Sequence, residues 1–312
     1  MTVYKDIASL PQFRNAIVTI GTFDGVHTGH RQIIELMKKE AALVNGETVI
    51  ISFDPHPRQV ISGDNQPVLL LNSLEEKIDL LDKNGIDHLV IVPFTIEFAS
   101  QTADDYIEQF LVNTFKPHTI IIGHDHRFGK NRSGDYELLE LRATKYHYKV
   151  KEIPGYMLQN ITISSTKIRQ ALQQCNIDVA NKFLGYDYFF SGKVIEGNKL
   201  GRTIGYPTAN LQIEDDNKLI PGNGVYAVTI SNKQRAIDNK KGMMNIGMRP
   251  TVNGTKRTIE VNIFDFDEDI YGEILTISIK KHLRSEVKFN GLEELKDQLA
   301  KDKIAAAEAL TD

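Results

Sequence analysis

The chain has one cysteine, no tryptophan and no long apolar run among its 312 residues. The single cysteine, Cys175, excludes an intramolecular disulfide and fits a reducing compartment. Apolar stretches such as HLVIVPF are far shorter than the roughly 20 residues that a membrane-spanning helix needs. The opening residues, MTVYKDIASL, lack the basic stretch and apolar run of a secretory signal. We therefore expect a cytoplasmic protein that has no membrane partner.

The chain also has no large excess of basic or of acidic residues. The chain carries 37 basic and 41 acidic residues, which gives a net charge of −4. This balance offers no electrostatic reason to expect nucleic acid as a partner. Domains commonly contain roughly 100–200 residues, so the length favours two. The oligomeric state stays open at this level.

Residues 1–185 alternate short apolar runs with segments whose apolar residues recur at helical spacing. Strands are expected at Ala16–Ile20, Thr48–Phe53, His88–Phe94, Thr119–Gly123 and Tyr148–Ile153. Helices are expected at His30–Leu43, Leu74–Asn84, Ala103–Thr114 and Tyr136–Thr144. This alternation predicts an α/β, Rossmann-like domain with a parallel sheet covered by helices.

Residues 186–312 have a different pattern, in which apolar and polar side chains partly alternate between turn-rich stretches. Strands are expected at Phe189–Ile195, Gly224–Ile230, Thr258–Phe264 and Ile274–Lys280. Such a pattern predicts a small antiparallel β-barrel. A helix closes the chain, with Leu292, Leu295 and Leu299 expected on a common face.

Polar motifs gather directly after the expected strands of the first domain. GTFDGVHTGH (Gly21–His30) follows the first strand, DPHPR the second, GHDHRFGKNRSG the fourth and ISSTKIR (Ile163–Arg169) the fifth. In open α/β sheets, ligands bind beyond the carboxyl ends of the strands. The motifs therefore predict one ligand site at that edge.

Two of these motifs suit a nucleotide. His27 and His30 lie three residues apart, so both imidazoles can donate hydrogen bonds to phosphoryl oxygens as charge develops, or they can simply cap the turn. In ISSTKIR, hydroxyl groups, Lys167 and Arg169 surround a helix start. That set forms an anion site suited to a triphosphate, although helix capping alone also explains the hydroxyls.

HTGH together with ISSTKIR resembles the nucleotidyltransferase superfamily. With FDPHP and GHDHRFGKNRSG added, the pattern is similar to the FMN adenylyltransferase module of bacterial FAD synthetase. The resemblance implies that the phosphate of FMN attacks the α-phosphate of ATP and that pyrophosphate leaves.

It also implies that His27 and His30 stabilise the developing charge and that Arg169 joins them in catalysis. ATP would contact Gly21, Phe23, Asp24, Ser165 and Thr166. Flavin would contact Asp54, His56, Asp125, Arg127, Phe128 and Arg132. For Phe128 a core position, and for His56 a rigid loop between two prolines, are the alternatives.

The second domain opens with GKVIEGNKLGRTIGYPTANL, which places Gly192, Gly197 and Gly201 before the tetrad PTAN. Glycines this close together predict tight turns or a loop folded over a ligand. Thr208 and Asn210 supply neutral oxygens suited to a magnesium–nucleotide complex. The Walker and protein-kinase motifs are absent.

With GVYAV, NIGMRPT, IEVNIFDFDEDIYG and LRSEVKF, this stretch resembles riboflavin kinase, a compact β-barrel family that phosphorylates riboflavin with Mg-ATP. By that resemblance Glu260 is the general base, the glycines, Thr208 and Asn210 hold Mg-ATP, and Arg284 and Phe289 lie near the flavin. A solvent-facing Glu260 paired with Lys256 or Arg257 is the alternative. Asn262 stands where the family often has histidine.

Taken together, the motifs indicate the bifunctional riboflavin kinase/FMN adenylyltransferase family. The implied small-molecule substrates are riboflavin, FMN and ATP; FAD is the final product, and Mg²⁺ arrives with ATP. Structural zinc is not expected, because the HDH sequence at His124–His126 lacks a second ligand pair. Two other functions remain open: adenylyl transfer to another phosphate, such as that of a pantetheine or nicotinate mononucleotide, and a β-barrel that only holds flavin.

Overall fold

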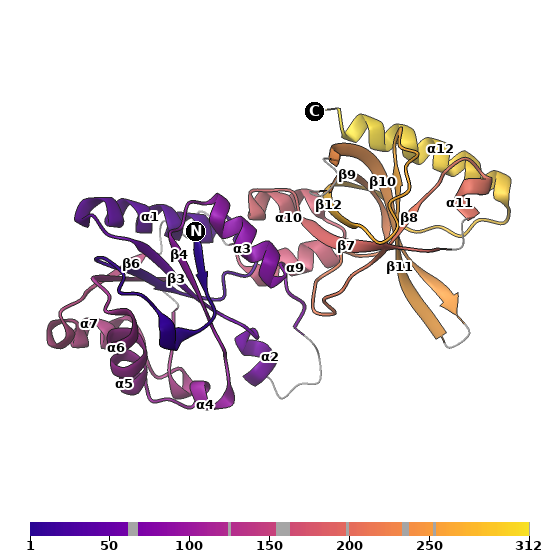
Figure 1. Ribbon diagram of the computed structural model, residues 1–312. Helices are drawn as coiled ribbons and strands as arrows, with labels where there is room; N and C mark the ends of the chain where they lie inside the picture. Colours follow the sequence, from indigo (N-terminus) through magenta and orange to yellow (C-terminus); the bar gives the residue numbers. More distant parts are fainter. Residues whose placement is uncertain are drawn as a thin grey trace. The chain divides into compact units, whose positions relative to one another are not determined.

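The computed structural model describes residues 1–61, 68–123, 126–153, 163–197, 200–232, 237–251 and 254–311. The chain forms two compact units, Met1–Ser165 and Thr166–Asp312 (Figure 1). The compact division thus falls earlier in the chain than the expected domain boundary at residue 185, which stays a prediction. Each unit is described by itself below.

The first unit is built on a parallel sheet of six strands in the order β1-β4-β3-β2-β5-β6. The strands are β1 (Thr2–Tyr4), β2 (Ile17–Ile20), β3 (Thr48–Phe53), β4 (His88–Val92), β5 (Thr119–Gly123) and β6 (Lys149–Ile153). All five expected strands and their parallel pairing are confirmed. The sequence missed β1, an edge strand of three residues that is too short to show a pattern.

Helices flank both faces of this sheet. They are η1 (Ile7–Ser9), α1 (Thr28–Val44), α2 (Pro57–Ile61), α3 (Leu74–Lys83), α4 (Ile96–Ala99), α5 (Ala103–Asp105), η2 (Tyr106–Val112), α6 (Asn113–Phe115), η3 (Lys130–Arg132) and α7 (Tyr136–Tyr146). The expected helix over residues 103–114 is present, but its middle, η2, is a π-helix. Val18 and Ile20 pack with Phe110 in the core on one face. Since side chains alternate along a strand, Ile17 points to the other face, where α1 packs on β2, β3 and β5.

The strand order places the end of β2 at a special position. β2 lies between β3 and β5. After β2, the chain adds β3 and β4 on one side of it and then adds β5 and β6 on its other side, so the strand order reverses at β2. The crevice beyond such a reversal of strand order is where open α/β sheets bind ligands. The turn after Ile20, which carries GTFDGVHTGH, lies at this point.

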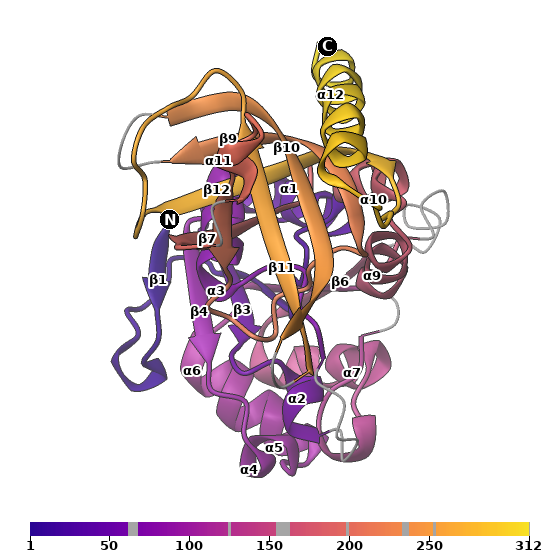
Figure 2. The same ribbon diagram turned by 90° about the vertical axis from the view of Figure 1, so that its right-hand side faces the viewer.

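The second unit is a closed barrel with the strand order β10-β11-β8-β7-β12-β9, as expected from the sequence (Figures 1 and 2). Its strands are β7 (Phe189–Ile195), β8 (Ala209–Gln212), β9 (Gly224–Asn232), β10 (Ile237–Thr251), β11 (Gly254–Ile263) and β12 (Ile274–Arg284). Its helices are α9 (Ser165–Gln173, whose first residue belongs to the first unit), α10 (Ile177–Leu184), α11 (Leu200–Thr203) and α12 (Leu292–Ala309). Helix α10 packs on β12, and α12 packs on β9, β10 and β12.

The three leucines expected on a common face of α12 differ in how deeply they are buried. Leu292 is 53% exposed, whereas Leu299 packs against a core cluster that includes Ala306 and Leu310. The helix begins at Leu292, and the residues that it buries, Asp302 and Ala306, lie in its second half. The first turn of α12 is therefore largely exposed.

Candidate active sites

The turn that follows β2 is strained. Phe23 and Val26 have φ angles of 48° and 35°, and Gly25 lies between them at 89°. Positive φ is unfavourable for a β-branched residue such as valine. Phe23 and Val26 are both buried, so the surrounding core holds this conformation in place. Strain of this kind is concentrated at binding and catalytic sites.

His27 and His30 lie against each other at the start of α1. Their rings stack with centroids 3.7 Å apart, and His27 is the N-cap, its Nδ1 accepting the His30 N–H at 3.3 Å. Gly29 permits this arrangement, because a Cβ atom there would lie 3.2 Å from the His27 ring. The capping role considered for these histidines is thus real for His27, and the capping bond also orients its ring.

Both histidines are neutral at pH 7. Burial lowers the pKa of His27 to about 4, with Asp24 opposing the shift. The pKa of His30 falls well below its ordinary value, first because of burial and then because of repulsion from His27 in its protonated form and from Lys77. Since Nδ1 of His27 accepts a hydrogen bond, its proton is on Nε2. Nδ1 of His30 is buried and has no hydrogen-bond partner among the residues that the structure describes.

Asp24 ties separate parts of the first unit to this turn. Its carboxylate accepts hydrogen bonds from the backbone N–H groups of Leu71 at 2.8 Å and Asn72 at 3.4 Å. Its carbonyl accepts the Ser165 hydroxyl at 2.9 Å. The structure therefore brings Gly21, Phe23, Asp24, Ser165 and the two histidines together. Thr166 and Arg169 follow on α9 in the second unit.

Phe128 belongs to the core. It is 6% exposed, and its ring stacks on Tyr106 with centroids 4.9 Å apart. A Cβ atom on Gly134 would lie 2.3 Å from this ring, which explains the glycine in KNRSG. Phe128 thus occupies the core position that the sequence left open as an alternative. A flavin contact for Phe128 stays a prediction.

The other expected flavin contacts differ in their surroundings. Asp54 is exposed at the end of β3, and His56 is 9% exposed, its Nδ1 accepting the Arg58 N–H at 3.2 Å. Arg127 forms an ion pair with Asp135. Arg132 is exposed and has a φ angle of 59°. Asp125 lies outside the described residues.

A cavity of about 200 Å³ opens in the second unit beside α12. It brings together the sequence-predicted residues Gly201, Thr208, Glu260, Arg284 and Phe289, and Asn262 also lines it. The apolar part of the wall includes Met243, Val287 and Leu299. A mixed wall of this kind suits an organic ligand with polar groups at one end.

Glu260 lies on β11 opposite Asn210 of β8 and Asn245 of β10. Its side chain is 14% exposed and forms an ion pair with Arg249. Burial raises the pKa of Glu260, and Arg249 opposes that shift. Arg257 instead binds the Ile220 carbonyl and the Asn223 side chain, so it is not the partner considered from the sequence. The strand register pairs Glu260 with Asn245 and Arg249 with Lys256, so it is the side-chain ion pair that reveals Arg249 as the partner.

The PTAN segment is held from two sides. Asn262 donates a hydrogen bond from its Nδ2 to the Pro207 carbonyl at 2.6 Å. On the other side, a Cβ atom at Gly197 would lie 2.1 Å from the Asn210 amide, so only glycine fits there. Gly192 does not line the cavity beside α12 or the smaller cavity next to PTAN. It pairs with Leu275 within the barrel.

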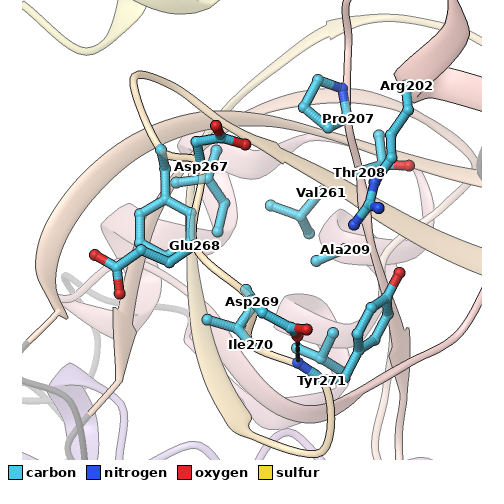
Figure 3. A pocket seen from close by; sticks show the side chains of 13 residues that line it. Arg202, Pro207, Thr208, Ala209, Val261, Asp267, Glu268, Asp269, Ile270 and Tyr271 are labelled. Carbon is cyan, nitrogen blue, oxygen red and sulfur yellow. Dashed lines mark hydrogen bonds between the residues drawn. The ribbon is translucent and has the colours of Figure 1, made fainter.

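A second cavity of about 80 Å³ lies next to PTAN (Figure 3). Pro207, Thr208 and Ala209 form one wall. The loop Phe266–Tyr271 lies across from them, and Asp269 accepts the Tyr271 N–H at 3.1 Å. Thr208 lines both cavities. The sequence pointed to FDFDEDIYG only as part of a resemblance, because no single residue in it has an unusual chemistry.

Arg284 is held firmly at the cavity wall. Its Nε donates to Asp302 Oδ1 at 2.8 Å and its Nη2 to Oδ2 at 2.6 Å. The guanidinium also lies 5.8 Å from the centre of the Phe289 ring. Both residues expected near the flavin therefore touch each other, and Asp302 is a partner that the sequence did not reveal.

Among the described residues, no group of three or more His, Cys, Asp or Glu side chains has a metal-binding arrangement. The described helices also include none that is long and apolar enough to cross a membrane.

Comparison with known proteins agrees with this geometry. The sequence model of the FAD synthetase family matches residues 10–167, and that of the riboflavin kinase family matches residues 184–310. The chain belongs to the bifunctional riboflavin kinase/FMN adenylyltransferase family. A member from Haemophilus influenzae is 38% identical over 91% of each chain. Another from Escherichia coli is 35% identical over 97% of this chain and 95% of its own.

The same architecture occurs in a solved structure. A crystal structure from Streptococcus pneumoniae, described as a macrolide-efflux protein, has a TM-score of 0.88 and 30% sequence identity. It covers 98% of both chains. The likeness extends over both units, so the whole two-unit fold is shared by that protein.

Proposed function

We propose that this family member converts riboflavin to FMN in its C-terminal unit and FMN to FAD in its N-terminal unit, using ATP twice. Both family models and the names of the relatives from Haemophilus influenzae and Escherichia coli support this pair of reactions. The observation that carries the proposal is the cavity where Thr208, Glu260, Arg284 and Phe289 meet, together with the histidine pair at the switch point.

In the first reaction, riboflavin occupies the larger cavity and ATP the smaller one beside PTAN. Thr208 lines both, so the γ-phosphate and the ribityl 5′-hydroxyl meet near its side chain. Glu260 takes the hydroxyl proton as the oxygen attacks the γ-phosphorus, and ADP leaves. Phosphoryl transfer depends mainly on positioning and charge neutralisation, so one carboxylate aimed at the hydroxyl suffices.

Magnesium fits the donor set beside Glu260. The Thr208 hydroxyl and the Asn210 amide are hard oxygen ligands of the kind Mg²⁺ accepts, and Asn210 lies directly opposite Glu260 in the barrel. Bound with ATP, the ion would neutralise phosphate charge. Asn262 supports this edge by holding the Pro207 carbonyl.

In the second reaction, an FMN phosphate oxygen attacks the α-phosphorus of ATP and pyrophosphate leaves. The two neutral imidazoles donate N–H groups to the phosphoryl oxygens, where charge develops. The buried Nδ1 of His30, which has no hydrogen-bond partner among the described residues, supports this role, because an oxygen of the ligand would supply that partner. Ser165, Thr166 and Arg169 bind the triphosphate, and the loops with Asp54, His56, Asp125, Arg127, Phe128 and Arg132 bind the flavin.

We also place this chemistry in the cytoplasm, on small molecules and without nucleic acid. The single cysteine and the balanced charge support this assignment.

Chromatography of the products formed from riboflavin, ATP and magnesium tests the proposal. The expected result is FMN followed by FAD. With FMN supplied in place of riboflavin, FAD and pyrophosphate should form, whereas pantetheine phosphate and nicotinate mononucleotide should accept no adenylyl group from labelled ATP. Unchanged riboflavin would refute the kinase assignment, and FMN without FAD would refute the adenylyltransferase assignment.

A further inference from the structure

Lys77 is a buried cation next to the histidine turn. It lies on α3 and is only 8% exposed. Its ammonium donates a hydrogen bond to the Ser52 hydroxyl at 3.2 Å, and that hydroxyl donates to the Thr22 carbonyl at 3.2 Å. The lysine is therefore linked, through one side chain, to the strained turn between Gly21 and Val26.

Three ionisable groups interact electrostatically with this ammonium. The carboxylates of Asp24, which is 2% exposed, and Asp54 favour its protonated form, although burial is the larger effect and lowers its pKa overall. The positive charge of Lys77 in turn contributes to lowering the pKa of His30. Lys77 thus interacts electrostatically with a histidine of the proposed site and with two residues expected to bind ATP and flavin.

A buried ammonium costs free energy unless it is paired. A methionine would fill a similar space, and Ser52 would keep its bond to Thr22 without Lys77. The buried carboxylate of Asp24 gains a counter-charge from Lys77, but filling this space does not by itself require a positive charge. The reaction does, because the α-phosphate and the FMN phosphate both carry negative charge and the two histidines beside them are neutral.

We propose that Lys77 is a further catalytic residue of adenylyl transfer, whose ammonium binds a non-bridging oxygen of the α-phosphate. This inference rests on the proposed function of the first unit. As the FMN oxygen bonds to the α-phosphorus, the bond from that phosphorus to the bridging oxygen breaks and pyrophosphate leaves. Lys77 stays protonated throughout and gives up no proton. Asp24 and Asp54 hold the cation in place before ATP arrives.

The test compares Lys77→Gln, Lys77→Met and Lys77→Arg with Lys83→Gln, a control at an exposed lysine of the same helix. FMN and ATP are supplied, and FAD is measured. Loss of one preorganised donor commonly lowers kcat roughly 100- to 1,000-fold. We expect that loss in both neutral variants, with KM values within about threefold of wild type, recovery of at least about tenfold in Lys77→Arg, and no change in Lys83→Gln.

A stereochemical measurement distinguishes direct binding of the α-phosphate by Lys77 from mere support of the histidine turn. ATP with sulfur in place of one α-phosphoryl oxygen exists as two diastereomers, and a cation bound to one oxygen makes the enzyme prefer one of them. We expect Lys77→Gln to lose most of that preference, which a residue that only supports the turn would leave unchanged. Riboflavin phosphorylation by these variants should match the wild type.

Neutral variants with kcat within about threefold of wild type would overturn the proposal. So would an unchanged preference between the diastereomers, and so would failure of both neutral variants to fold, which would assign Lys77 a structural role. A wild-type protein that makes no FAD would instead refute the proposed function of the first unit. The two failures are therefore distinguishable.

Discussion

The ion pair between Arg249 and Glu260 sets the proton affinity of the carboxylate that we propose as the kinase base. Burial favours the neutral form of Glu260, whereas the guanidinium favours the charged form. A general base acts only when it is ionised. Arg249, which also lines the larger cavity, thus keeps Glu260 active at lower pH than burial alone would allow.

Replacing Arg249 by methionine should move the acid limb of the kinase pH profile to higher pH. Without the cation, the pKa of Glu260 rises further above its ordinary value, so less of the base is ionised at the acid end. We expect a several-fold loss of kcat/KM for riboflavin there and a much smaller loss at alkaline pH. Measuring FMN formation across pH checks this, with Lys240→Met, an exposed position on the same strand, as the control. A loss that is equal at every pH would contradict it.

The sequence was sufficient to single out the residues whose types and spacing are unusual. His27 and His30 stand three apart after an apolar strand, and Glu260 stands in a strand that matches a known motif. Lys77 and Arg249 were missed for a physical reason. In the sequence, a lysine in a helix and an arginine in a turn-rich segment are ordinary surface residues; the burial of Lys77 and the ion pair of Arg249 with Glu260 appear only in the structure.

At the scale of elements, α12 forms one wall of the larger cavity, to which Leu295, Leu299 and Asp302 contribute. It is fastened to the barrel by the bidentate pair of Asp302 with Arg284. The Asp302 side chain is 4% exposed and the Arg284 side chain 21%, so water screens the pair only weakly. Gln298 also donates to Asp302 at 2.9 Å.

Asp302→Asn should therefore loosen the helix. It removes one charge and leaves a partly buried guanidinium without its counterion, which typically costs on the order of 3 kcal/mol. The measurement is the free energy of unfolding of the barrel unit in denaturant, together with the KM for riboflavin, which should rise. Asp297→Asn, an exposed position on the same helix, should change neither value. Equal stability of the two variants would show that the pair does not fasten α12.

Elements with strong periodicity were predicted well, and those with mixed composition were not. The bounds of β3, β5 and β7 match the expected ranges. In β3 and β5 this is because runs of β-branched residues end at clear turns. The strands β8 and β10 were missed, although β8 carries Asn210. PTANLQ and KKGMMNIGMRP alternate poorly and contain glycine or proline, so their strand structure depends on pairing with β11.

At the scale of the whole molecule, the two reactions belong to different stretches of the chain, residues 10–167 for the FAD synthetase family and residues 184–310 for the riboflavin kinase family. The product of one unit is the substrate of the other, so FMN has to leave the barrel before it is adenylylated. Among the described residues, none of those in the histidine turn, Gly21–His30, lines the larger cavity of the second unit. A defect in one reaction should accordingly leave the other intact.

Two single variants test this independence when they are mixed. Glu260→Gln should make no FMN from riboflavin but should convert supplied FMN to FAD, while His30→Ala should make FMN and stop there. Mixed in equal amounts with riboflavin and ATP, they should form FAD after a lag, since FMN must first accumulate in solution and then bind the second variant. The lag should shorten as the concentration of His30→Ala rises. If either variant loses both activities, or if the mixture makes no FAD although each keeps its remaining activity, the two units do not exchange FMN through solution as independent catalysts.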